Sequence, residues 1–213
     1  MTTQERATEI FARLTRRYPA PQSALDWTDA WELMVATILA AQCTDERVNK
    51  VTPALFSRWR GPAAMAQADV AEVEQAVRST GFFRNKAKNI VGAAQMVMRV
   101  HGGEVPRTMV ELTALPGVAR KTANIVLSNA YGINEGLAVD THVKRLSFRM
   151  GLTASQNVAI IEKDLMKLFP RPTWGDVNHR LVLFGRDVCD SRRPLCTQCE
   201  LADICPRQGV ETA

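Results

Sequence analysis

Near its middle the chain reads Leu115-Pro116-Gly117-Val118-Ala119-Arg120-Lys121-Thr122-Ala123, and this run decides the fold. A Pro-Gly pair interrupts helical patterns on both sides, and a new helix begins near Ala119. Backbone N–H groups at such a turn and helix start form a site for a phosphate oxygen, without sequence preference. An ordinary connection between two helices has the same pattern. The run therefore predicts two helices joined by a short turn, and it leaves phosphate binding open.

Helical periodicity extends from this turn toward both ends of the chain. Apolar residues recur at the spacing of one helix face in two stripes: Trp31, Met34, Val35, Ile38 and Leu39, then Ala123, Val126, Leu127, Ala130 and Tyr131. The patterns at 69–72 and 108–111 are typical of capping boxes that open further helices. Helices are also expected at 84–101, 155–169 and 176–188. Because no stretch alternates with a period of two, the sequence predicts an all-α protein of roughly nine or ten helices.

The composition narrows the classes of protein. With 213 residues, of which 46% are hydrophobic, the chain is long enough for one large domain or two compact lobes. Its 27 basic and 22 acidic residues give a net charge of +5, which favours a polyanionic partner only slightly. The N-terminus lacks a signal-like apolar segment, and polar residues interrupt the longest apolar run, 27–43. We therefore expect a cytoplasmic protein without membrane contact, whose cysteines stay reduced.

Four of the five cysteines lie close together near the C-terminus: Cys189, Cys196, Cys199 and Cys205. The chain after Val188 is poor in periodic apolar residues and too short for its own core, so these thiols predict a metal site that stabilises it. Zinc ribbons usually have two Cys-x-x-Cys knuckles and this segment has one, whereas iron–sulfur clusters also use four close thiolates. Spacing alone leaves the metal undecided. Arg192 and Arg193, between the first two cysteines, form either a solvated face or a phosphate contact.

Three motifs in this order resemble the endonuclease III family of helix–hairpin–helix DNA glycosylases: residues 115–126, Val139-Asp140-Thr141-His142, and the four cysteines. The resemblance extends along nearly the whole chain, including residues 41–45 and 81–83. It implies an all-α fold of two helical lobes that flank an active cleft. A six-helix lobe with the helix–hairpin–helix would span residues 23–134. The two chain ends, residues 1–22 and 135–213, would form the cluster lobe.

The resemblance also assigns roles to single residues. Lys121 matches the family's nucleophile, Asp140 its catalytic aspartate, and the four cysteines the ligands of a [4Fe–4S] cluster. Gln42 matches the residue that fills the gap left by a flipped nucleotide, and Phe82 falls where a side chain wedges into the base stack. The other expected DNA contacts are Gly117, Ala119, His142 and Arg193.

Several of these positions also have simpler interpretations. Ala119 replaces the second hairpin glycine; a positive φ there would cost about 1 kcal/mol or more, and a helical backbone would cost nothing. Gln42 could be a satisfied core amide, and Phe82 a packed loop aromatic. Asp140, placed before Thr-His-Val, is also a good helix N-cap. Cys43 is an extra thiol relative to the family pattern, which we interpret as a small buried hydrophobe.

The resemblance therefore implies a bifunctional DNA glycosylase/AP lyase that removes oxidised pyrimidines from duplex DNA in base excision repair. The Lys121 amine would attack C1′ of the damaged nucleotide, form a Schiff base and cleave the strand by β-elimination. Arg120 and the helix start disfavour a cation at Lys121, which favours the attack. Asp140 would stabilise positive charge on the sugar and help to move the amine proton. We expect a nucleoid-associated monomer whose partner is double-stranded DNA with oxidised pyrimidines or abasic sites.

Two other functions fit part of the pattern. An adenine glycosylase that acts on mispairs shares the hairpin and the cluster, but it lacks a lysine at the position of Lys121 and usually carries an extra C-terminal domain. A non-catalytic DNA-binding module stabilised by a metal would need no pairing of Lys121 with Asp140. Borohydride trapping on abasic DNA distinguishes such a module from an enzyme.

Overall fold

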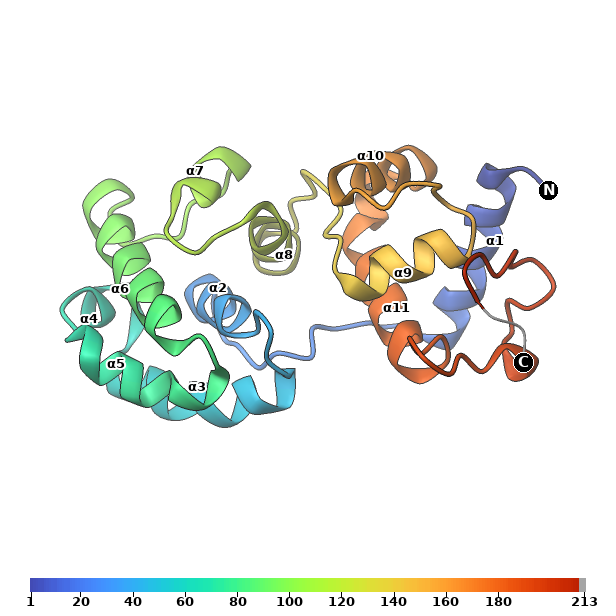
Figure 1. Ribbon diagram of the computed structural model, residues 1–213. Helices are drawn as coiled ribbons and strands as arrows, with labels where there is room; N and C mark the ends of the chain where they lie inside the picture. Colours follow the sequence, from blue (N-terminus) through green and yellow to red (C-terminus); the bar gives the residue numbers. More distant parts are fainter. Residues whose placement is uncertain (211–213) are drawn as a thin grey trace. The chain divides into compact units, whose positions relative to one another are not determined.

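The computed structural model describes residues 1–210, and helices joined by loops make up this part of the chain (Figure 1). It contains eleven α-helices, three short 3-10 helices and no β-strand, so the expected all-α fold is confirmed. The α-helices are α1 (Thr3–Arg17), α2 (Ala30–Leu39), α3 (Asp45–Arg58), α4 (Gly61–Ala66), α5 (Val70–Val77), α6 (Phe83–Val100), α7 (Met109–Ala114), α8 (Arg120–Tyr131), α9 (Thr141–Arg149), α10 (Val158–Leu168) and α11 (Trp174–Asp187). The expected nine or ten helices were too few, in part because α4 has only 6 residues and shows no periodic stripe.

The chain divides into two compact units. The central unit comprises Ser23–Glu135, and the terminal unit comprises Met1–Gln22 together with the chain from Gly136 onward. Each unit has its own cluster of buried apolar side chains. The N-terminal helix α1 belongs to the terminal unit, where it contacts α10 and α11, which lie far from it in the sequence (Figure 1).

Helix α2 forms the centre of the core of the central unit. Asp29 fixes its start, because the Asp29 carboxylate accepts a hydrogen bond from Glu32 N at 2.8 Å. Every residue from Leu33 to Leu39 is buried, so α2 is covered on all sides rather than along the single stripe that the sequence predicts. Helices α3, α4, α6 and α8 supply contacts around it. A helix that is apolar on all sides needs such cover to be stable.

The helix–hairpin–helix comprises α7, the turn at 115–119, and α8. Thr108 begins α7, because its Oγ1 accepts from Glu111 N at 3.3 Å, and Gly132, with φ of 65°, ends α8. Leu115 and Val118 are buried under the turn, and Val118 N donates to Leu115 O at 3.1 Å. The two helices and the short turn predicted from the sequence are therefore present.

The terminal unit packs α1, α9, α10 and α11 around buried side chains such as Phe184. Thr2 and Glu5 form a capping box that begins α1: Thr2 Oγ1 accepts from Glu5 N at 3.2 Å, and Glu5 Oε2 accepts from Thr2 N at 2.7 Å. After Val188 the described chain is irregular apart from one 3-10 turn, Cys196–Gln198. Over residues 1–210, no helix combines the length and the apolar character that crossing a membrane requires.

Candidate functional site

The turn of the helix–hairpin–helix lies directly against α6. Gly117 has φ of +77°, and a Cβ added to it would lie 2.8 Å from Asn89 Cβ on α6. Both the backbone conformation and the neighbouring side chain therefore require glycine at this position. Gly117 is nevertheless exposed on its outer side. A rigid, exposed backbone turn without a side chain is the arrangement that a phosphate group can approach closely.

Ala119 is the N-cap of α8. Its backbone is extended, with φ of −83° and ψ of 166°, so the strained alternative considered from the sequence is wrong and alanine fits without strain. Its methyl group cannot accept a hydrogen bond from the first turn of α8, which has no side-chain cap. The positive end of the α8 dipole is therefore open to an external anion.

Lys121 and Asp140 each lie at the start of a helix, and they belong to different units. Lys121 is exposed in the first turn of α8, in the central unit. Asp140, half-buried in the terminal unit, is the N-cap of α9, and its Oδ1 accepts from Val143 N at 2.7 Å. The cap interpretation of Asp140 is therefore confirmed. This hydrogen bond engages one carboxylate oxygen of Asp140 and fixes the orientation of its side chain.

His142 packs closely against α11. A Cβ added to Gly185 would lie 2.7 Å from His142 Nδ1, so the glycine makes room for the imidazole. Arg145 Nη2 lies 3.1 Å from the same ring nitrogen. Burial lowers the pKa of His142, which favours a neutral ring that can exchange hydrogen bonds without carrying charge.

Gln42 and Phe82 are exposed residues with left-handed backbone. Gln42 has φ of 53° and Phe82 has φ of 47°, an uncommon conformation for residues other than glycine. The Phe82 side chain is 64% exposed, so the packed-aromatic interpretation is wrong, and Gln42 is exposed rather than part of the core. The stripe on α2 does not extend to Gln42, because α2 ends at Leu39. Strained, exposed residues of this kind concentrate at functional sites.

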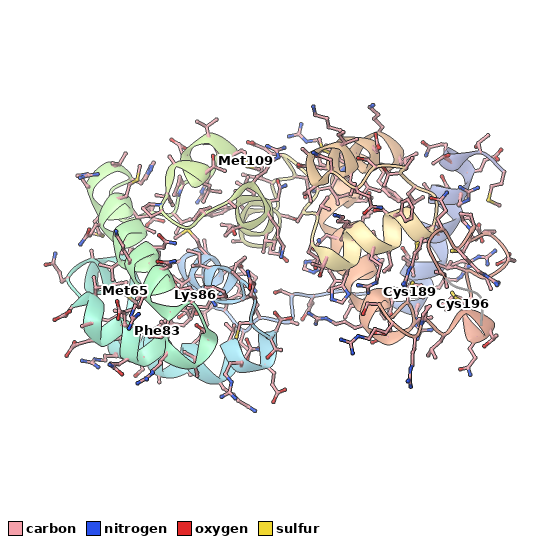
Figure 2. The ribbon with its side chains drawn as sticks, viewed as in Figure 1. Met65, Phe83, Lys86, Met109, Cys189 and Cys196 are labelled. Atoms are coloured by element: carbon pink, nitrogen blue, oxygen red, sulfur yellow. The ribbon has the colours of Figure 1, made fainter. Side chains whose placement is uncertain are left out.

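The four C-terminal cysteines line one pocket in the terminal unit, together with Arg149, Phe184 and Leu201 among other residues. Figure 2 labels two of them, Cys189 and Cys196. Within residues 1–210, no three His, Cys, Asp or Glu side chains are close enough together to hold a single metal ion. Burial raises the pKa of Cys199 to about 11 and raises the pKa of Cys205. A cationic centre in the pocket would lower these two pKa values, because it would stabilise the thiolate, which is the form of cysteine that binds metals.

The loop between Cys189 and Cys196 is held by hydrogen bonds that the sequence pattern does not predict. The Asp190 carboxylate accepts from Arg192 N at 2.8 Å and from Arg193 N at 3.0 Å, and these two bonds lower its pKa. Arg149, which is buried, donates to Asp190 O at 2.6 Å and to Ser191 O at 2.8 Å. The side chains of Arg192 and Arg193 are exposed on this fixed loop.

Arg145 supports the same region from α9. It donates to the carbonyl oxygens of Cys189 and Gly185, at 3.0 Å and 2.9 Å. Sequence analysis missed both Arg145 and Arg149. The one signal for them is their spacing of a single helical turn, which places them on the same face of α9.

Comparison with known proteins shows the family to which the chain belongs. The family model described as "HhH-GPD superfamily base excision DNA repair protein" matches residues 35–171. The chain is 55% identical over 203 residues to endonuclease III of Synechocystis sp., covering 95% of this chain and 93% of that protein. It is also similar to two solved structures, a non-covalent endonuclease III–DNA complex and a trapped endonuclease III–DNA covalent intermediate. Each of these has a TM-score of 0.93 and 40% identity and covers 97% of both chains. The chain therefore belongs to the endonuclease III family of HhH-GPD base excision DNA repair proteins.

Proposed function

We propose that Lys121 is the nucleophile and Asp140 the catalytic carboxylate with which this chain excises oxidised pyrimidines from duplex DNA. As an endonuclease III family member, the chain is a bifunctional DNA glycosylase and AP lyase of base excision repair. One observation carries the assignment of the nucleophile: Lys121 is exposed in the first turn of a helix that lacks a side-chain cap and directly follows the turn at Gly117. This argues for an enzyme rather than a non-catalytic binding module.

The chemistry follows from an amine at a helix start. The neutral Lys121 Nζ attacks C1′, the N–C1′ bond forms, and the glycosidic bond breaks so that the base leaves with the bonding electrons. Opening of the sugar gives a Schiff base, loss of a C2′ proton breaks the C3′–O bond, and the strand is cut on the 3′ side. The Asp140 carboxylate stabilises positive charge on the sugar and accepts or returns a proton.

DNA docking is proposed to use the phosphate backbone. The turn at Gly117 and the uncapped start of α8 at Ala119 present backbone N–H groups to one phosphate. Arg193, on the loop fixed by Asp190, contacts a second phosphate, and His142 donates a hydrogen bond from its neutral ring. Because such contacts release counterions, affinity falls steeply as the salt concentration rises.

Gln42 and Phe82 are proposed to enter the duplex when the damaged base leaves it. Both side chains are exposed on strained turns, which suits residues that act outside the protein core. Gln42 fills the gap with a side chain that can hydrogen-bond to the orphaned base, and Phe82 wedges between neighbouring bases.

The pocket in the terminal unit is proposed to hold a [4Fe–4S] cluster on Cys189, Cys196, Cys199 and Cys205. A single zinc ion would bring all four sulfurs to about 2.3 Å from one centre, whereas a cluster of four irons holds its thiolates further apart. Four cysteines that line one pocket supply the four thiolates that such a cluster requires. Bound by these four cysteines, a cluster would supply folding energy to a segment with little apolar surface, and the four ligands would leave no open position for water. We further propose that the protein acts as a monomer on chromosomal DNA in the cytoplasm.

Borohydride trapping tests the nucleophile. The variant Lys121→Gln is expected to lose the trapped complex with abasic DNA while it still binds that DNA, because the amide cannot form a Schiff base. The control Lys163→Gln removes an exposed lysine from α10 and is expected to trap like the wild type. Undiminished trapping by Lys121→Gln would identify another amine as the nucleophile. Release of thymine glycol, but not of adenine from a mispair, tests the substrate class.

A further inference from the structure

Lys86 is a buried lysine whose ammonium binds two backbone carbonyls. It lies on α6 in the central unit, and it is only 4% exposed (Figure 2). Its Nζ donates to Leu39 O at 2.8 Å and to Thr80 O at 2.7 Å. Burial lowers the pKa of Lys86, because both acceptors are neutral carbonyls that compensate only part of the lost hydration.

The two carbonyls belong to the two segments that carry the strained residues. Leu39 is the last residue of α2, shortly before Gln42, and Thr80 ends a 3-10 turn just before Gly81 and Phe82. Lys86 N also donates to Phe82 O at 3.1 Å, so its backbone begins α6 while its side chain holds the preceding turn. The segments are far apart in sequence, and one ammonium joins them.

Packing alone does not explain a lysine at this position. A buried ammonium is costly, and an apolar side chain of similar length would fill the same space without that cost, although it would leave both carbonyls without this donor. The ammonium satisfies Leu39 O and Thr80 O together and thereby fixes the separation between them. Both left-handed residues need surroundings that hold them in place, since their conformation is unfavourable by itself.

We propose that Lys86 is a positioning residue that holds the Gln42 and Phe82 turns at the spacing required to enter DNA together. The inference rests on the proposed insertion roles of those two residues. Lys86 does not contact DNA or the reacting atoms. Its effect should therefore be confined to the step in which a base leaves a duplex, and it should be absent where there is no base stack to enter.

Two substrates separate this step from the lysine chemistry. Single-turnover excision of thymine glycol from a duplex requires insertion, whereas borohydride trapping on a single-stranded abasic oligonucleotide requires only the amine. For Lys86→Met we expect duplex excision to fall by about 10-fold to 100-fold, the scale of a small misplacement of positioning groups. Single-stranded trapping should change by less than about twofold. The control Lys163→Met removes an exposed lysine and should leave both rates unchanged. If Lys86→Met does not fold, Lys86→Arg, which keeps the charge and the donors, is tested on the same two substrates and should show a smaller loss confined to the duplex.

A double-mutant cycle tests whether the loss of duplex excision in Lys86→Met acts through Gln42. If Lys86 acts through the insertion turns, Gln42→Ala combined with Lys86→Met should be little worse than the more damaging single variant, because both remove the same function. Multiplied losses on duplex DNA, or equal losses on duplex and single-stranded DNA, would overturn the inference. A wild-type protein that traps abasic DNA but excises no thymine glycol would instead refute the proposed substrate. A Gln42→Ala variant with full duplex activity would refute the insertion role and the inference with it.

Discussion

The variant Gly117→Ala tests whether the hairpin turn owes its position to close packing on α6. The substitution has two costs. The left-handed φ of +77° costs an alanine about 1–2 kcal/mol. The new Cβ would also lie 2.8 Å from Asn89 Cβ, an overlap with a helix-borne atom that has little room to move, and overpacking of this kind costs about 1–3 kcal/mol more. We therefore expect a loss of about 2–5 kcal/mol in the free energy of unfolding.

Gly102→Ala is the matched control, because Gly102 has φ of +61° and nothing lies within 4 Å of an added Cβ. It should show the conformational cost without the overlap. Urea unfolding measures the free energy of unfolding of both variants. Their affinity for an abasic duplex at fixed salt reports whether the turn still binds DNA. Gly117→Ala should lose affinity because its turn is displaced, whereas Gly102→Ala should not. Equal loss of stability in the two variants would refute the argument from close packing.

Two further predictions concern the cysteine pocket and the two roles of Asp140, as a helix cap and as a catalytic carboxylate. Cys199→Ser should yield protein that lacks the yellow-brown absorption of an iron–sulfur cluster and has lower solubility and lower DNA affinity. Its single-turnover rate at saturating protein should fall less than its DNA affinity does. Colourless wild-type protein that contains one zinc and is fully active would contradict this prediction. Asp140→Asn keeps an N-cap acceptor for Val143 N and should unfold like the wild type while losing activity, whereas Asp140→Ala should also lose about 1 kcal/mol of stability. Full activity in Asp140→Asn would reduce Asp140 to its capping role.

Local patterns in the sequence predict the parts of this structure that depend on local interactions. The stripe on α8, the N-caps at Asp69 and Thr108, and the Pro-Gly turn are determined by near neighbours in the chain, and each appears where expected, although neither cap is the reciprocal capping box that the pattern predicts. The backbone of Gln42 and Phe82 is different, since no local rule favours left-handed geometry for these residue types. That geometry depends on packing between segments that only the folded chain brings together.

Buried cations are the feature of this chain that sequence reasoning is least able to predict. Lys86 binds a carbonyl 47 residues away, and Arg149 binds one 41 residues away. In the sequence both look like ordinary polar residues of amphipathic helices. In the structure Lys86 holds two turns of the central unit through backbone oxygens, and Arg149 holds one loop of the terminal unit in the same way. The two turns carry Gln42 and Phe82, and the loop carries Arg193, all of them residues proposed to contact DNA. A carbonyl is available at every residue, so a buried cation can fix a loop without constraining the side chains that the loop presents. This leaves those side chains exposed for DNA while the backbone beneath them stays in place.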